Sequence, residues 1–252
     1  MFRSLNILRN YSILATDGAL GSVSDVYFDD RSWTVRHLVV DTGHWLPGRR
    51  VLIPTSALGT PDAARDEFPV DLTKEQVKNA PSSDEDKPVD RQHEAELYGY
   101  YGWAPYWGGD IMMPGGVGVG GLGDAMPLPA TIPPEPPSSD EGDPHLRSGR
   151  DIIGYAIAAA DSDIGEVSDI LIDDRDWRIR YFLVDTGKWL PGRKVVLSPE
   201  WVKGIEWAEH KVVVDLTREQ VEASPEYDEV EGVNRAYEEG LYAHYRRNSY
   251  WA

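Results

Sequence analysis

The chain has 252 residues, which is enough for one large β domain or for two domains of about 100 residues each. It carries 43 acidic against 25 basic residues, a formal net charge of −18, and this balance disfavours binding to nucleic acid or to anionic membranes. Cysteine is absent, which excludes disulfides, thiolate nucleophiles and Cys-ligated metals. The first residues lack the apolar core of a signal peptide, and no stretch reaches the ~20 apolar residues of a membrane span, so we expect a cytoplasmic protein without such a span.

The sequence contains a long internal duplication. Residues 39–54 read VVDTGHWLPGRRVLIP, and residues 183–198 read LVDTGKWLPGRKVVLS, an offset of 144 positions. The same offset aligns about residues 11–101 with their copies without a gap. We therefore predict two copied domains, residues 1–107 and 148–252, joined by a Gly- and Pro-rich linker over residues 108–147.

Each copy reads as a series of short β-strands that ends in a helix. In the second copy, residues 164–174 alternate polar and apolar residues, and residues 178–186, 193–198, 204–210 and 211–216 are short runs rich in Val, Ile and aromatic residues. Thr217 with Gln220, like Thr73 with Gln76, has the spacing of a capping box at the start of a short helix. Because the connections between strands are too short for crossover helices, we predict a mainly β fold, two small antiparallel β-barrels, each followed by a short helix and an aromatic-rich tail.

The two Asp-Thr-Gly triplets allow two interpretations. In a bilobal aspartic protease, Asp41 and Asp185 would lie close together and share one proton. We favour an architectural role, because His44 and Lys188 follow the triplets, the apolar element that braces such a catalytic loop is missing, and the linker is long.

In the architectural interpretation each triplet belongs to a hairpin. Its Asp caps turn amides, Pro-Gly occupies a type II turn, Trp covers one barrel end, and Arg pairs with the Asp across the hairpin. The predicted turn residues are Asp41, Gly43, Trp45, Pro47, Gly48 and Arg49, and in the second copy Asp185, Gly187, Trp189, Pro191, Gly192 and Arg193.

No other motif predicts a catalytic residue, a metal site or a cofactor. Asp161-Ser-Asp163 has only a partial likeness to a calcium loop, and the first copy lacks the second carboxylate. Asp29-Asp30 and Asp173-Asp174 are typical of hairpin tips, with divalent-ion binding as the alternative. The six histidines lack ligand spacing, and no glycine run has the context of a phosphate-binding loop.

The tail of each copy is dense in Tyr and Trp. These residues either cover their own barrel or dock on the sister barrel or on a second chain, since Tyr and Trp are favoured in interfaces. The candidate interface residues are Tyr98, Tyr101, Trp103, Trp107, Tyr242, Tyr245, Tyr250 and Trp251.

The segments Leu20-Gly-Ser-Val-Ser-Asp25 and Ile164-Gly-Glu-Val-Ser-Asp169, each followed by the hairpin with Asp-Thr-Gly, resemble the PRC-barrel family. This family is named after the cytoplasmic domain of the photosynthetic reaction centre H subunit. The resemblance implies a small, mostly antiparallel β-barrel that serves as a docking or regulatory module. It favours a non-enzymatic protein that binds a protein partner, with pairing of the two barrels or a homodimer as further expectations. An H-subunit-like regulator of membrane electron transfer is the alternative within the family.

Overall fold

The structure is a computed structural model that describes residues 1–46, 49–62, 64–80, 91–103, 105, 146–187, 190 and 192–251. Most of the predicted linker, residues 108–145, lies outside the described residues, as do Pro47, Gly48, Trp189 and Pro191. Strands dominate both copies, which confirms the mainly β class.

The first repeat is built around the ladder β6-β2-β3-β4-β5. Thr73 caps α2, and its capping box with Gln76 is formed as predicted. The elements of this repeat are β1 (Phe2–Ser4), α1 (Leu5–Leu8), β2 (Ser12–Ala15), β3 (Gly18–Asp29), β4 (Thr34–Asp41), β5 (Arg50–Pro54), η1 (Thr55–Ala57), β6 (Glu67–Pro69), α2 (Lys74–Asn79) and α3 (Arg91–Tyr101).

The second repeat follows the same plan and adds one strand, giving the ladder β11-β10-β9-β8-β13-β12. Its elements are β7 (Leu146–Ser148), α4 (Gly149–Ile152), β8 (Ala156–Ala158), β9 (Asp163–Asp173), β10 (Arg178–Asp185), β11 (Lys194–Leu197), η2 (Pro199–Trp201), β12 (Val202–Glu206), η3 (Trp207–Glu209), β13 (Lys211–Val214), α5 (Arg218–Glu222) and α6 (Arg235–Tyr245). Since β7 begins at Leu146, the second repeat starts two residues before the predicted boundary at residue 148.

Neither repeat is the closed antiparallel barrel that the sequence predicts. In each repeat one pair is parallel, β2 with β6 and β8 with β13. Two parallel strands must be joined by a long connection, which is usually a helix. Here the antiparallel strands that lie between them in the chain make that connection, so no helix is needed. The edge strands β11 and β12 do not pair with each other, and the chain joins them through η2, so the described sheet is not closed by hydrogen bonds.

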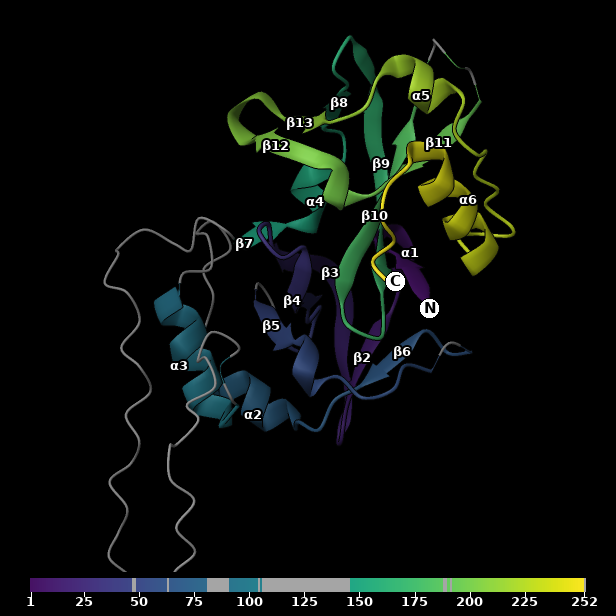
Figure 1. The fold of residues 1–252 in the computed structure, drawn as a ribbon. Helices are drawn as coiled ribbons and strands as arrows, with labels where there is room; N and C mark the ends of the chain where they lie inside the picture. The colour runs from purple at the N-terminus through teal and green to yellow at the C-terminus, as the bar shows by residue number, and fades with distance from the viewer. Residues whose placement is uncertain are drawn as a thin grey trace, which may run out of the picture.

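The two repeats exchange their first strands. Phe2 in β1 pairs with Asp173 in β9, and Leu146 in β7 pairs with Asp29 in β3. Adding the repeat offset of 144 to Phe2 and Asp29 gives Leu146 and Asp173, so the two contacts are equivalent. Such reciprocal contacts are typical of a two-fold symmetric interface. Figure 1 shows β7 lying beside β3 of the first repeat, and α1 contacts β9 of the second. The repeats thus form one continuous sheet of 13 strands.

The centre of this pseudo-two-fold arrangement lies at the tips of two hairpins. Thr34 and Arg178 are equivalent residues, and they pair with each other where β4 meets β10. Trp33 and Trp177 both adopt a positive φ, 55° and 57°. The carbonyl of each Trp accepts a hydrogen bond from the sister hairpin, at 2.7 Å in both cases. The left-handed backbone of these bulky residues is therefore held by the contact between the repeats.

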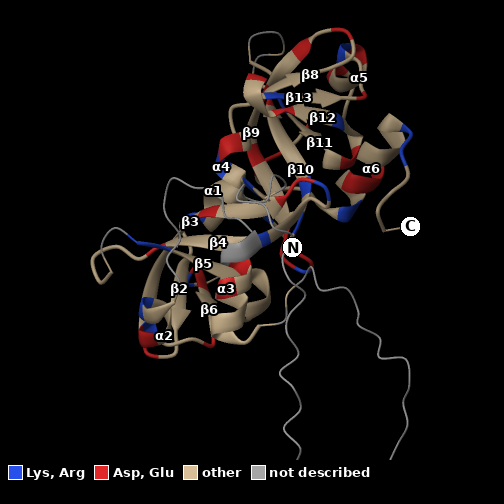
Figure 2. Cartoon of the chain, turned by 90° about the vertical axis from the view of Figure 1, so that its left-hand side faces the viewer, with Lys and Arg blue, Asp and Glu red and all other residues tan. Residues whose placement is uncertain are grey.

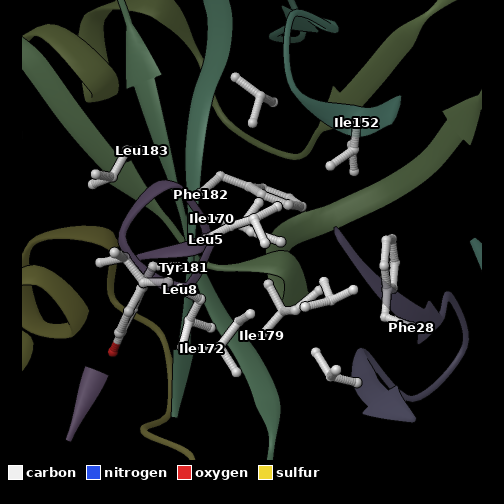
Figure 3. Close-up of a cluster of buried hydrophobic side chains, with 14 of the residues drawn as sticks. Leu5, Leu8, Phe28, Ile152, Ile170, Ile172, Ile179, Tyr181, Phe182 and Leu183 are labelled. Carbon is white, nitrogen blue, oxygen red and sulfur yellow. The ribbon is translucent and has the colours of Figure 1, made fainter. Parts of the chain in front are cut away.

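One hydrophobic core runs through both repeats. Leu5 of the first repeat is fully buried and lies near Ile170 and Phe182 of the second (Figure 3). Its equivalent, Gly149, contributes no side chain, and a Cβ placed there would come within 2.6 Å of Val26 and 3.1 Å of Leu5. The two repeats therefore pack as a large residue against a small one at the axis, so their interface is not symmetric in detail.

Candidate functional site

The Asp-Thr-Gly triplets build a turn. Asp41 accepts a hydrogen bond from the Gly43 N–H, and Asp185 accepts one from the Gly187 N–H, both at 2.8 Å. The glycines have φ values of 60° and 61°, where glycine is favoured. The buried hydroxyl of Thr42 lies 2.7 Å from the Leu46 carbonyl oxygen and 2.8 Å from that of Arg49, so it holds the loop closed. Capping of the turn amides by the Asp is as expected.

The predicted pairing of Arg49 with Asp41 and of Arg193 with Asp185 is wrong. The guanidinium of Arg49 donates to the carbonyls of Lys78 and Ala80 at the end of α2. Arg193 donates in the same way to the end of α5. The last carbonyls of a helix have no partner within the helix and carry its negative dipole end, so they are available to a guanidinium. An exposed pair with the Asp would contribute little by comparison with this double bond.

The other turn residues are placed only in part. Trp45 is half-buried, and its indole N–H donates to the Leu20 carbonyl across the mouth of the first repeat. Lys74 lies over the Trp45 ring, 5.7 Å from its centroid. Gly192 has a φ of 77°, in the region that favours glycine. The predicted roles of Pro47, Gly48, Trp189 and Pro191 concern residues outside the described ones.

The arrangement of the triplets contradicts the aspartic-protease alternative. β4 and β10 meet in antiparallel fashion at Thr34 and Arg178, and each runs for eight residues away from that contact. At about 3.3 Å per residue, Asp41 and Asp185 lie on the order of 40 Å apart along the two strands. Both carboxylates are exposed, so they share neither a cleft nor a proton.

The remaining acidic motifs also have structural partners. Asp29 accepts hydrogen bonds from the amides of Arg31 and Ser32 at the hairpin tip. Burial alone would raise the pKa of Asp29, but these two amides and the Arg36 guanidinium outweigh it and lower the pKa below its usual value. Asp161 accepts from the first amide of α5, at 2.9 Å from Arg218 N. Within the described ranges no group of three metal-ligating side chains occurs.

The aromatic tails pack on their own repeats. Tyr98, Tyr242 and Tyr245 are buried, so these three candidate interface residues belong to the core, where they cover apolar strand surface. Burial raises the pKa of Tyr245 to about 12. The other described candidates are half-buried, whereas Trp107 lies outside the described residues; the half-buried ones are Tyr101, Trp103, Tyr250 and Trp251.

Each tail helix also inserts one buried carboxylate, a feature missed from the sequence. Glu238 in α6 accepts from the Tyr181 hydroxyl at 2.6 Å and lies 3.1 Å from the Arg235 guanidinium. The equivalent residues of the first repeat, Glu94 and His37, lie 3.6 Å apart and are fully buried. The repeat offset aligns His37 with Tyr181 and Glu94 with Glu238. A polar side chain at the same position of an apolar strand in both copies could have indicated such a pair.

A pocket lies beside the hairpin tip at the seam between the repeats. It has a volume of about 250 Å³, is walled by Trp33, Tyr242 and Tyr250, among others, and carries three arginines against one carboxylate, Glu200. The arginines are Arg31, Arg178 and Arg180.

A second pocket, of about 390 Å³, shares Arg31 and Trp33 with the first. It is lined on its other side by Val202, Lys203, Gly204 and Ile205, four consecutive residues that belong to β12. Arg147 lies 4.3 Å over the ring of Trp207 and 3.2 Å from the Asp30 carboxylate. Because they share Arg31 and Trp33, the two pockets adjoin at the seam, and we call them together the seam groove.

The seam groove is basic in a protein that is otherwise acidic. Its cationic residues are Arg31, Arg147, Arg178, Arg180 and Lys203, and its lining carboxylates are Asp30 and Glu200. Two of the cations also pair outside the lining, Lys203 with Asp215 at 2.8 Å and Arg180 with Asp176. Figure 2 shows acidic residues spread over both repeats, so this sign reversal is local. Such a groove can bind a negatively charged group of matching shape.

Comparison with known proteins assigns both repeats to the same domain family. A family model described as the PRC-barrel domain matches residues 2–77 and again residues 144–221, together more than half of the chain. No curated protein matches the sequence. Among the described residues, none of the helices has the length and apolarity that crossing a membrane requires.

Proposed function

Since the chain belongs to the PRC-barrel family in both of its repeats, we propose that it is a non-enzymatic interaction module that binds a protein partner and serves as a scaffold or regulator. A cytoplasmic location is part of this proposal. The observation that carries it is the exchange of β1 and β7, which joins the two repeats into one sheet. A single body of this kind can present a binding surface that neither repeat has alone.

Two observations support a binding role: the contacts that the acidic motifs make and the distribution of charge. The acidic residues of the Asp-Thr-Gly turns and hairpin tips are engaged in turn and helix-end contacts, while the cations of the seam groove gather at the junction of the repeats. A net charge of −18 disfavours nucleic acid and anionic membranes as partners. A folded protein or a peptide with a local charge pattern suits the seam better.

Affinity purification of the tagged full-length chain from its native host, after mild crosslinking, tests this proposal. We expect a protein partner at near-stoichiometric yield, retained by the wild type and by Asp41→Asn. The proposal fails if no protein exceeds background. It also fails if the purified chain digests casein at pH 4 in a manner that Asp41→Asn abolishes.

A further inference from the structure

Resting on that proposed function, we propose that the seam groove binds an extended acidic peptide segment of the partner, which adds as a strand to the free edge of β12. Two independent features of the structure lead to this: the position of β12 in the sheet and the state of the arginines around it.

β12 has an open edge. It is the last strand of the sheet order and pairs only with β13 among the described strands. Successive residues of a strand point to opposite faces, yet four consecutive residues of β12, Val202 to Ile205, line the same pocket. The pocket therefore adjoins the edge of β12 and not one face, which is where a peptide adds by main-chain hydrogen bonds.

Among the described residues, the second repeat alone has a strand at this position. The equivalent of β12 in the first repeat is the segment from Leu58. It makes two isolated bridges, Leu58 with Val70 and Asp62 with Glu67, but no strand, and it includes Pro61, which has no N–H to donate. The strand and the basic groove thus occur together on one side of the seam. Their joint presence is what a binding site for an extended acidic chain requires.

Part of the groove's charge is available to a ligand. Arg147, Arg180 and Lys203 are paired with Asp30, Asp176 and Asp215, whereas Arg31 and Arg178 are not paired within the described structure. In the second repeat Arg175 is held by the Asp173 carboxylate at 2.6 Å. Its equivalent Arg31 has no such bond: Asp29 bonds instead to Arg36 and to the turn amides, and within the described structure the Arg31 guanidinium makes no ion pair. The Arg178 guanidinium is likewise unpaired within the described structure, and it stands where the first repeat has Thr34.

Deeper in the groove a donor also lacks a partner. Arg180 binds Asp176 through one end of its guanidinium and stacks 3.9 Å over the Tyr250 ring, but its buried Nε has no hydrogen-bond partner in the described structure. A buried donor without a partner costs stability. Because Arg180 lines the pocket, a carboxylate bound there could pair with its guanidinium. The aromatic walls accommodate the apolar side chains that alternate with the acids in an extended peptide.

Calorimetric titration of the purified full-length chain tests the proposal. The probe is a blocked nine-residue peptide with alternating Val and Glu, and its matched control carries Gln in place of Glu. We expect 1:1 binding of the Glu peptide that weakens with salt, and at least about tenfold weaker binding of the Gln peptide. A Glu peptide with proline at its centre should also bind at least about tenfold more weakly, because a main-chain donor is lost.

Variants locate the site. Arg31→Gln combined with Lys203→Gln should weaken binding of the Glu peptide at least about tenfold, whereas Arg175→Gln, the equivalent position across the pseudo-axis, should change it by less than about twofold. Equal binding of the Glu and Gln peptides, no binding at all, or equal losses in the two variants would overturn the proposal. Binding of phosphatidylserine vesicles through Arg31 and Lys203, or displacement of the peptide by equimolar inorganic phosphate, would also overturn it. If a partner co-purifies while both peptides fail to bind, only this inference falls and the interaction role stands.

Discussion

At the scale of single residues, the duplicated fold depends on glycines that allow close approach. Gly21 and Gly165 have φ values of 152° and 138°, and a Cβ there would lie 1.9 and 2.1 Å from the carbonyl oxygens of Asp41 and Asp185. These glycines let β3 and β9 pass against the strands that end in the Asp-Thr-Gly turns. The Leu-Gly or Ile-Gly of the family motif is thus a packing requirement for the turn that follows it.

The pair Leu5 and Gly149 yields the first prediction. Gly149→Leu should destabilise the protein by about 1–3 kcal/mol, because the new side chain meets Val26 and Leu5. Leu5→Gly leaves a cavity and should cost at least as much. The double variant moves the leucine to the other side of the pseudo-axis, so urea unfolding should show it to be more stable than the sum of the single effects by about 1 kcal/mol or more. If the effects of the two substitutions were strictly additive, the packing of Leu5 against Gly149 would be contradicted.

Asp25 gives a prediction about pH. It accepts hydrogen bonds from the Ser148 hydroxyl at 2.6 Å, from Arg150 N at 3.0 Å and from Val26 N at 2.8 Å. Burial raises its pKa in spite of these bonds. Because the folded pKa lies above the unfolded value, the ionised carboxylate costs stability near neutral pH, and that cost disappears as the pH falls through the folded pKa.

Asp25→Asn keeps the hydrogen-bonding shape and removes this titration. The unfolding free energy of the wild type should therefore rise relative to that of Asp25→Asn as the pH is lowered from 7 to 4. Urea unfolding of both proteins at several pH values measures the difference, in which the other titrating groups cancel. A difference that stays constant, or one that changes in the opposite direction, would contradict the role given to burial.

At the scale of elements, the short helices are fastened to the hairpins by arginine. Arg193 donates to the carbonyls of Glu222 and Ser224, and Arg193→Ala should destabilise the protein by about 1–2 kcal/mol. Arg193→Lys should recover less than half of that loss, since an ammonium group cannot bridge two carbonyls as a planar guanidinium does. Thermal unfolding of the three proteins tests this, and equal stability of the Lys variant and the wild type would refute the bridge.

The elements also show which parts of the fold could be predicted. The capping boxes at Thr73 and Thr217 and the long strands β3 and β9 follow from local patterns, and they were predicted from the sequence. The partners of Arg193 lie 29 and 31 residues away, and no local pattern carries that information. The strands β1 and β7 have three residues each, too few to show the polar–apolar alternation of a strand. The duplication also does not indicate with which repeat each of them pairs. The seam groove was missed for this reason, because it exists only once the repeats are paired.

At the scale of the whole molecule, the chain is a dimer of related domains in one polypeptide. In a dimer of identical first repeats two copies of Leu5 would meet at the axis, and in a dimer of second repeats two copies of Gly149 would leave it empty. The two repeats therefore complement each other better than either complements itself. The exchanged strands hold the repeats together but do not add to this preference. Ser4 bonds to Asp169 and its equivalent Ser148 bonds to Asp25, so a dimer of either repeat would keep the same contact.

This argument predicts how separated repeats behave. Residues 1–107 and 144–252, produced as two chains and mixed, should form a 1:1 complex, measured by size-exclusion chromatography with light scattering. Its mass should lie below the 28.2 kDa of the intact protein, because residues 108–143 are left out. Each chain alone leaves an unpaired edge on β3 or β9, so it should unfold at lower denaturant concentration than the mixture. Gly149→Leu in the second chain should weaken the complex at least about tenfold, while Arg175→Gln should leave it intact. If each chain instead formed a stable homodimer that did not exchange with the other, the pairing would rest on the shared strands alone, and the leucine–glycine contact would carry no selectivity.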